Sequence, residues 1–316
     1  MRHFVLQRLL QMVVTLAIVA ILVFAFSELL PGDIGRAMLG RFATPDQVLR
    51  LNHELGADRP LVERFVDWAT HFAAGDWGTS QLLDTPVQSL VVDRLANSLL
   101  LSVVALIVVV PLSILAGLMA GVNENGLVDR FVTVVGLSMT VIPEFVSGVV
   151  LLVIFAVALH ILPVTAQAPQ GSGLGTRIEY LILPSLPLVF ELFGYIARMA
   201  RATTLAVVEA PYYRTAILKG LPRRRILTHH VLRNSLPASV TVVAAQFGYL
   251  VGGLVVVERL FNYPGIGKLL LDSAVHHDIR VVEACALTLA VLIMVANLVA
   301  DVSYGVLNPR VRYAGR

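Results

Sequence analysis

Charged residues are scarce in this chain of 316 residues. They make up 14% of the sequence, whereas hydrophobic residues make up 57%. Soluble globular domains have about 25% charged and about 45–50% apolar residues. This composition excludes an ordinary soluble domain and, with a mean hydropathy of +0.80, indicates a membrane protein.

Cysteine and catalytic motifs are nearly absent as well. The single cysteine, Cys285, lies within an apolar run, so neither a disulfide framework nor a cysteine-based metal site is available. The chain contains neither H-E-x-x-H nor G-x-S-x-G, which argues against the alternative of an intramembrane hydrolase. The pairs His229-His230 and His276-His277 lack a third ligand at a useful spacing. We therefore expect no catalytic residue, no cofactor and no metal.

Long apolar segments are abundant. A helix needs about 20 mostly apolar residues to cross a bilayer core of ~30 Å. The segments that meet this length are Leu9–Leu30, Ser98–Val122, Phe131–Leu159, Tyr180–Val208, Leu236–Val257 and Ala284–Leu307. Prolines within them, such as Pro143, are tolerated when neighbouring helices satisfy the freed carbonyls. We predict an all-α polytopic membrane protein with six transmembrane helices, the first of which is a retained anchor because it is longer than a signal-peptide core.

The basic residues predict the orientation. If both termini are cytoplasmic, most arginines and lysines near the spans lie inside, as the positive-inside rule requires. These residues are Arg2, Arg8, Arg130, Arg198, Arg201, Arg214, Lys219, Arg223, Arg224, Arg225, Arg233, Arg310, Arg312 and Arg316. The polar segment 31–97 then lies outside the cytoplasm. Thr44 as N-cap and Pro45 at the first helical position start a small helix there, and Leu49, Leu51, Leu55, Phe65, Val66 and Trp68 supply an apolar face.

The domain organisation follows from these assignments. Residues 1–30 form a cytoplasmic N-terminus and the first transmembrane helix, and residues 31–97 form an extracytoplasmic helical cap. Residues 98–308 hold the other five spans, with a loop at 209–235, and residues 309–316 are a cytoplasmic tail. We find no internal repeat and no low-complexity tract.

A polar, basic run from Glu209 to Pro237 separates two of the most apolar segments. Its first part, from Glu209 to Gly220, is typical of one short helix that a left-handed glycine terminates. Tyr213, Ala216, Ile217 and Leu221 recur at spacings of three and four and therefore share one face. We predict that this face docks into a groove on another protein. The alternative is an ordinary basic loop near anionic headgroups, where each Lys or Arg contributes about 1 kcal/mol.

The pattern from Glu209-Ala210 to Gly220, followed by Asn234-Ser235-Leu236-Pro237, resembles the EAA loop of ABC importer permeases. Its particular residues resemble the dipeptide, oligopeptide and nickel branch of that family. Further matches are Leu30-Pro31-Gly32-Asp33, Leu55-Gly56, Asp58-Arg59-Pro60-Leu61, Gly75-Asp76-Trp77-Gly78-Thr79-Ser80, Val257-Glu258, Phe261, Pro264-Gly265-Ile266-Gly267 and Asn308-Pro309-Arg310. The resemblance covers nearly the whole chain.

This resemblance implies a type I ABC importer permease fold in a bacterial inner membrane. It implies that the loop couples the spans to a separate ATPase through Glu209, Ala210, Tyr213, Arg214, Thr215, Ala216, Lys219, Gly220 and Leu221. The implied partners are a second homologous permease, two cytoplasmic ATP-binding subunits and an extracytoplasmic solute-binding protein, with no nucleic acid. The chain has no Walker A motif, so it is expected not to be an enzyme. Peptides are the expected solute, with a nickel chelate, glutathione or an opine-like compound as alternatives.

Two positions depart from the pattern of that branch. Pro211 follows Glu209-Ala210, which predicts a helix that starts later, and Ile217-Leu218 stand where the branch often has a more basic or smaller pair. We therefore expect the chain to require a specific partner ATPase.

Ionisable residues inside spans mark functional sites by default. Glu144 and Glu191 lie near the middle of the third and fourth spans, and Glu191, Gly194, Arg198 and Arg201 share one helical face. Glu144, Glu191 and Arg198 are therefore candidates for lining the pathway, where the carboxylates would contact a cationic group of the solute. The alternative is that both carboxylates serve packing. Glu28 and Asp301 are expected to be structural.

Two stripes of small residues allow helices to approach closely. Gly117-x-x-x-Gly121 and Gly248-x-x-x-Gly252 can serve either an interface with a second permease or packing within the chain. A channel or secondary transporter that works alone is a further alternative, which the specialised Glu209–Pro237 loop disfavours.

Overall fold

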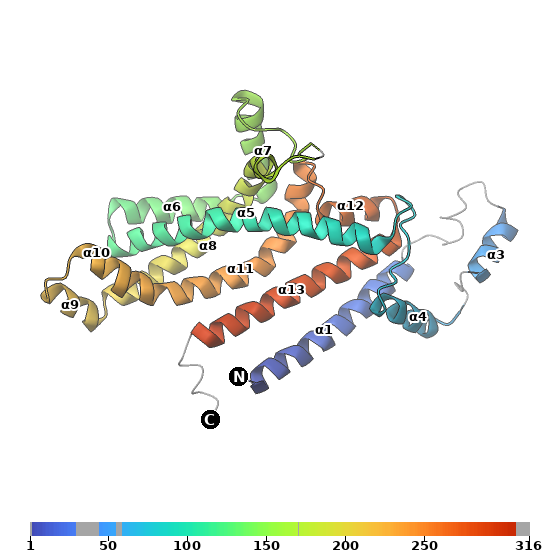
Figure 1. The fold of residues 1–316 in the computed structure, drawn as a ribbon, viewed down its shortest axis with the longest axis horizontal. Coiled ribbons are helices and arrows are strands. Elements are labelled where there is room, and N and C mark those ends of the chain that lie inside the picture. Colours follow the sequence, from blue (N-terminus) through green and yellow to red (C-terminus); the bar gives the residue numbers. More distant parts are fainter. Residues whose placement is uncertain (1, 30–43, 55–58, 170, 308–316) are drawn as a thin grey trace. The chain divides into compact units, whose positions relative to one another are not determined.

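The computed structural model describes residues 2–29, 44–54, 59–169 and 171–307. Predictions that concern Leu30 to Asp33, Leu55 to Asp58 and the tail from Asn308 lie outside the described residues. The regular structure is helical (Figure 1), with one isolated β-bridge between Thr79 and Pro86. The elements are α1 (Arg2–Leu29), α3 (Pro45–Glu54), α4 (Leu61–Ala73), α5 (Val87–Val122), α6 (Leu127–Val141), α7 (Glu144–Leu152), η1 (Val153–Ala158), α8 (Leu174–Val208), α9 (Pro211–Leu218), α10 (Arg223–Arg225), η2 (Ile226–Leu232), α11 (Arg233–Leu260), α12 (Ile266–Val275) and α13 (Ile279–Leu307).

Several predicted spans are confirmed as long apolar helices. Among the described residues, four helices are long and apolar enough to cross a membrane: Leu6–Glu28, Val87–Val122, Leu174–Val208 and Ile279–Ser303. The predicted span Leu236–Val257 falls within the single helix α11, which is not among these four.

The predicted span Phe131–Leu159 is not one continuous helix. It is a pair, Leu127–Val141 and Glu144–Ala158, bent by 102°, which brings the number of candidate spans to five if the pair crosses the membrane once. The break lies at Ile142 and Pro143. Ile142 has an extended backbone (φ −74°, ψ 120°), because the ring of a following proline disfavours the helical conformation. The predicted single span therefore consists of two helices that meet at Pro143.

The chain divides into two compact units. The first consists of Met1–Leu6, Ala96–Lys268 and Leu292–Arg316, and the second of Gln7–Leu95 and Leu269–Val291. Each is described by itself below.

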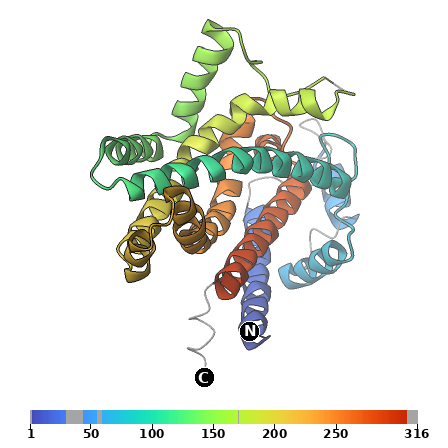
Figure 2. The same cartoon turned by 60° about the vertical axis from the view of Figure 1, so that its left-hand side comes forward.

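Helix α8 is the centre of the first unit. It packs against α6, α7 and α11, and Figures 1 and 2 show it lying against α5 and α6 as well. Its buried side chains, among them Leu188, Leu192 and Ile196, belong to one continuous hydrophobic core with Leu101 of α5 and Leu254 of α11. The core therefore joins helices that are far apart in the sequence.

Glycines permit the close approach of α8 to its neighbours. A Cβ atom at Gly117 would meet the backbone oxygen of Ala197, and one at Gly121 would lie 2.6 Å from the Cβ of Thr204. On α6, a Cβ at Gly136 would lie 3.3 Å from the Cα of Gly194. The Gly117-x-x-x-Gly121 stripe therefore serves packing within the chain, which decides between the two alternatives for that stripe.

A buried carboxylate joins three segments at one end of the first unit. Glu258, near the end of α11, is fully buried. It accepts hydrogen bonds from the hydroxyl of Ser98 in α5 and, at 2.9 Å, from the backbone N–H of Lys268 in α12. The Ser98 hydroxyl oxygen in turn accepts a bond of 2.8 Å from the N–H of Ile266. A Cβ at Gly265 would collide with the carboxylate, so the Pro264–Gly267 turn is shaped around Glu258.

Tyr263 supports the same turn. Its hydroxyl donates to the backbone oxygen of Asn97 at 2.8 Å, and the side-chain amide of Asn97 donates to the oxygen of Pro264 at 2.9 Å. Burial raises the pKa of the Tyr263 hydroxyl above its ordinary value, so this tyrosine remains a neutral donor.

The second unit contains an aromatic cluster that holds α4 to the end of α1. Phe24 of α1 contacts Phe65 and Trp68 of α4, and Phe72 continues the row to Trp77, whose ring stacks on it at 4.7 Å. Helices α3 and α4 are the small helices that the sequence predicts in this region. The predicted apolar face is only partly correct, because Phe65 and Trp68 pack whereas Leu49 and Val66 are exposed. Val66 follows Phe65 directly and therefore points to another side of the helix.

Two polar features fix the ends of these elements. Thr44 precedes α3, and its backbone N–H donates to the side-chain oxygen of Gln47 at 3.0 Å, which is one half of a capping box. Glu28, at the end of α1, forms an ion pair of 2.5 Å with Arg64 of α4. The expected structural role of Glu28 is consistent with this pair.

We predict that Gly117→Ala lowers the melting temperature of the purified protein. The added methyl group meets the backbone of α8, which cannot move aside as a flexible side chain can, and such overpacking costs about 1–3 kcal/mol. Gly175→Ala is the matched control, because a Cβ at Gly175, also in a helix, meets nothing within 4 Å. Equal melting temperatures for the two variants would contradict the packing described above.

Candidate functional site

The predicted short helix in the polar run is present as α9. Ala210 is its N-cap with an extended backbone (φ −68°, ψ 144°), and Pro211 occupies the first turn. A proline favours both the extended residue before it and the first position of a helix. The helix therefore starts after Glu209-Ala210, as the position of Pro211 predicts.

Gly220 ends the helix in the way that the sequence predicts. Its φ is +68°, which is a left-handed conformation that favours glycine. The N–H of Gly220 donates to the oxygen of Ile217 at 2.9 Å, and the N–H of Leu221 donates to the oxygen of Ala216 at 3.4 Å. These bonds satisfy carbonyls that the end of the helix would otherwise leave open.

One face of α9 packs against the rest of the first unit. Ala216 is buried in a small cluster with Val207 of α8 and with Ile226 and Val231 of η2, and Tyr213 and Leu221 pack against this cluster. The cluster also includes Leu118 and Val122 at the end of α5. Helix α9 is therefore fixed to the ends of α5 and α8 and to η2.

The outward surface of α9 differs from the predicted one. The sequence predicts that Tyr213, Ala216, Ile217 and Leu221 together form a docking face. Instead, Tyr213, Ala216 and Leu221 face the protein, and Ile217 is 52% exposed. Spacing identifies residues that share a face but does not tell which side is covered. The most exposed apolar side chain is Leu218, at 87%, with Tyr212 also exposed.

The charges of this surface are positive. Arg214 and Lys219 are exposed on α9 and its C-cap, and α10, which consists of Arg223, Arg224 and Arg225, follows after Pro222. Glu209, before the helix, is also exposed. An exposed leucine bordered by cations suits a partner that offers an apolar recess with acidic groups nearby.

Helix η2, which connects α10 to α11, is a π-helix and contains His229 and His230. The hydrophobic pattern of the sequence gives no sign of it, because the extra residue of a π turn leaves no compositional mark. π-helical turns are often found at functional sites.

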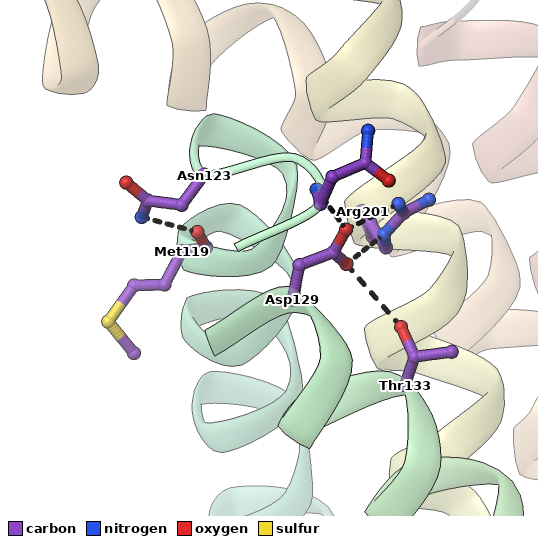
Figure 3. Close-up of polar contacts among 6 residues, drawn as sticks. Met119, Asn123, Asp129, Thr133 and Arg201 are labelled. Atoms are coloured by element: carbon purple, nitrogen blue, oxygen red, sulfur yellow. Dashed lines mark hydrogen bonds and ion pairs between the residues drawn. The ribbon is translucent and has the colours of Figure 1, made fainter. Parts of the chain in front are cut away.

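A buried ion pair ties α6 to α8 near α9. Asp129 of α6 is 4% exposed, and both of its carboxylate oxygens bind the guanidinium of Arg201 in α8, one of them at 2.7 Å from Nη2. The backbone N–H of Asn125 donates to the same carboxylate at 2.9 Å, and Thr133 lies beside it (Figure 3). The sequence analysis does not single out Asp129 or its pairing with Arg201.

The two acidic residues of the predicted pathway are neighbours. Glu144 begins α7 directly after the break at Pro143, and its carboxyl group lies near that of Glu191 in α8. Both side chains are half-buried.

The remaining residues of that face of α8 have separate environments. Gly194 packs against Gly136 and Thr140 of α6, and Arg201 binds Asp129. Arg198 is exposed, with its guanidinium carbon 5.6 Å from the centre of the Tyr195 ring. The structure thus brings Glu144 and Glu191 together but directs Gly194 and Arg201 into the contact with α6.

Comparison with known proteins identifies the class. Residues 113–313 match the family described as binding-protein-dependent transport system inner membrane component, and residues 1–102 match the N-terminal region of that component. The chain is 33% identical over 310 residues to a probable peptide ABC transporter permease of Sinorhizobium fredii, covering 98% of this chain and 99% of the relative. It is 37% identical over 313 residues to the glutathione transport system permease of Salmonella typhimurium. It is 35% identical over 313 residues to the glutathione transport system permease of Escherichia coli K12. Each of these alignments covers 99% of this chain and 100% of the relative.

The chain therefore belongs to the family of inner membrane components of binding-protein-dependent transport systems. Within that class it is the permease subunit of an ABC importer, an inner membrane protein with several spans, and is not itself an enzyme. A component of a binding-protein-dependent system works with a solute-binding protein and with an ATPase. The resemblance noted in the sequence is confirmed.

We predict that Asp129→Ala lowers the free energy of unfolding by about 2–3 kcal/mol, because it leaves the guanidinium of Arg201 without its charged partner. A thermodynamic cycle measures the coupling: Asp129→Leu, Arg201→Leu and the double variant are compared by thermal or denaturant unfolding. The double variant should lose less than the sum of the single variants. Strict additivity would show that the ion pair contributes nothing to holding α6 against α8.

Proposed function

We propose that this permease imports short peptides, including glutathione, which is itself a tripeptide. The support is that the relatives that cover the whole chain are named as a peptide permease and as glutathione permeases. These solutes share amide bonds, a free amino group and carboxylates, so one pathway can serve the class. A nickel chelate or an opine-like solute is the alternative within the same machinery.

We propose the following topology and assembly. The chain crosses the membrane six times in the type I importer arrangement, with the bent pair α6 and α7–η1 as one crossing, α11 as another and both termini in the cytoplasm. The segment 31–97 is an extracytoplasmic cap, residues 98–308 are the transmembrane domain, and residues 309–316 are a cytoplasmic tail. A second, homologous permease completes the pathway, and two ATP-binding subunits drive it. The distribution of arginine and lysine supports this orientation.

We further propose that α9 couples the permease to its ATPase. The observation that carries this proposal is the combination of a buried Ala216 with an 87% exposed Leu218 on a helix of eight residues. The helix is fixed on one side and offers a single apolar contact on the other. Tyr213, Thr215 and Leu221 position it, Gly220 provides the turn, and Glu209, Ala210, Arg214 and Lys219 border the contact.

The mechanism follows from the attachments of α9. Its buried face touches the ends of α5, α8 and η2, so a displacement of α9 by a closing ATPase is transmitted to these helices directly. The ion pair between Asp129 and Arg201 adds α6 to the same group. These helices then move as a body between inward-open and outward-open states, as alternating access requires.

For the pathway, we propose that Glu144, Glu191 and Arg198 face the solute. Glu144 lies at the start of α7, directly after the bend at Pro143, and is near Glu191. Two adjacent carboxyl groups attract a cationic group, and the amino terminus of a peptide is such a group. Arg198, which is exposed on the same helix, is available to a carboxylate of the solute.

We predict that Leu218→Ser reduces ATP-driven uptake and the amount of ATPase that copurifies with the permease. A buried leucine contributes about 1.5–3 kcal/mol at such a contact, so a loss of about tenfold or more is expected. Leu127→Ser is the matched control, because Leu127 is 85% exposed at the start of α6. Normal ATPase copurification with Leu218→Ser would refute the coupling role while leaving the solute class untouched.

We predict that Glu144→Gln and Glu191→Gln reduce the uptake of peptides with a protonated amino terminus more than that of N-acetylated peptides. The substitutions keep the size of the side chains and remove the negative charge. The measurement is the ratio of the two uptake rates in vesicles that contain the whole transporter. If both variants keep the wild-type ratio, the carboxylates serve packing.

A further inference from the structure

The second unit contains a cavity that the transport function does not explain. Its volume is about 510 Å³, within the range of about 300–1,000 Å³ that is typical of small-molecule sites. It lies between the last turn of α1, helix α4, the loop of residues 74–81 and the first turn of α13.

The cavity lies at the ends of two candidate membrane spans. The candidate spans in α1 and α13 are Leu6–Glu28 and Ile279–Ser303. The cavity is lined by Glu28 at the end of the first span and by Ile279 and Arg280 at the start of the other. It is therefore at the depth where phospholipid headgroups lie, whichever side of the membrane that end faces.

The aromatic residues fit the same depth. The chain has two tryptophans, Trp68 and Trp77, and both line this cavity together with Phe24 and Phe72. Tryptophan is enriched at membrane–water interfaces because its ring is apolar and its N–H is polar. Both N–H groups are already used: that of Trp68 donates to Glu283 at 2.8 Å, and that of Trp77 donates to the oxygen of Phe72 at 3.0 Å. The rings therefore form a fixed apolar wall.

The cavity carries charges of both signs. Arg64 is paired with Glu28, and Arg59 with Asp67. Arg280 is exposed and lies with its guanidinium against Gly78, where a Cβ would be 3.1 Å from Nη1. Arg280 interacts electrostatically with Glu283 of the same helix, but among the described residues it forms no salt bridge. Asp76, across the same opening, accepts one bond from the N–H of Gly78 at 3.2 Å.

An exposed guanidinium that is held in no salt bridge with a described residue, beside an aromatic wall and exposed carboxylates, matches a zwitterion. Arginine binds phosphate with parallel N–H groups, and the start of α13 adds the positive end of a helix dipole. Asp76 and Asp67 suit a protonated amine. Nearer the middle of its candidate span, α1 offers exposed apolar side chains such as Leu22 and Ile18.

We propose that this cavity binds the headgroup of a zwitterionic phospholipid that carries a phosphate and a primary amine, such as phosphatidylethanolamine. The phosphate binds Arg280, the ammonium group binds Asp76 and Asp67, and the acyl chains lie along the exposed side of α1. A lipid held there links α1, α4 and the start of α13 at the membrane surface.

The experiment counts lipids bound to the intact transporter by native mass spectrometry. The complex is purified in mild detergent and titrated with phosphatidylethanolamine or phosphatidylglycerol of identical acyl chains. Wild type should prefer phosphatidylethanolamine. Arg280→Gln removes the phosphate contact and should weaken both lipids about five- to tenfold. Asp76→Asn should weaken phosphatidylethanolamine alone, and Arg280→Lys should retain most of the binding.

Arg50→Gln is the matched control for charge. Arg50 is exposed on α3 in the same unit and does not line the cavity, so this variant should bind both lipids as wild type does. Unchanged lipid binding by Arg280→Gln would overturn the proposal.

Two other results would also overturn it. If soluble phosphoethanolamine displaces the lipid at equal concentration, the cavity takes a dissolved ligand and not a membrane lipid. If Arg280→Gln leaves lipid binding unchanged but abolishes association of the solute-binding protein, the cavity is a protein contact. None of these measurements involves uptake, so their failure leaves the proposed import function intact.

Discussion

The rest of the first unit depends on the closeness with which α8 approaches its neighbours. Lipid tails are as apolar as leucine side chains, so transfer of a side chain from lipid to a helix interface gains little free energy. Membrane helices therefore associate mainly through close van der Waals packing. Gly117 and Gly121 on α5 and Gly136 on α6 remove the side chains that would hold α8 away. Once the backbones are close, the core around Leu192 and the ion pair between Asp129 and Arg201 can form.

The features that the sequence predicts well are local ones. Long apolar helices follow from composition, since a bilayer selects for them directly. The start of α9 after Ala210 and its end at Gly220 follow from the conformational limits of proline and the freedom of glycine. The start of α3 at Pro45 has the same origin. Each of these features is decided within a few residues of where it is read.

The features that the sequence does not predict depend on what lies next to a segment. Spacing groups Ile217 with Ala216, but only the contact with η2 and α8 determines that Ala216 is covered and Ile217 is exposed. Pro143 allows a bend, but its angle of 102° and the packing of α7 on α8 cannot be read from the local sequence. Asp129 and Arg201 are 72 residues apart, and no local pattern connects them. The coupling role of α9 is implied by the family resemblance, and that of Glu144 and Glu191 by the position of ionisable residues inside predicted spans; both roles are proposals.

The burial of Glu258 has a consequence for the order in which the protein is assembled. Its partner Ser98 precedes it by 160 residues, and a chain enters the membrane from its N-terminal end as it is synthesised. When α5 to α8 have been inserted but α11 has not yet been synthesised, the Ser98 hydroxyl lacks the carboxylate of Glu258 as its acceptor. The part of α5 around Ser98 reaches its final environment only after α11 and the Pro264–Gly267 turn have been synthesised. The site that Ser98 begins is therefore completed by a carboxylate that is synthesised 160 residues later.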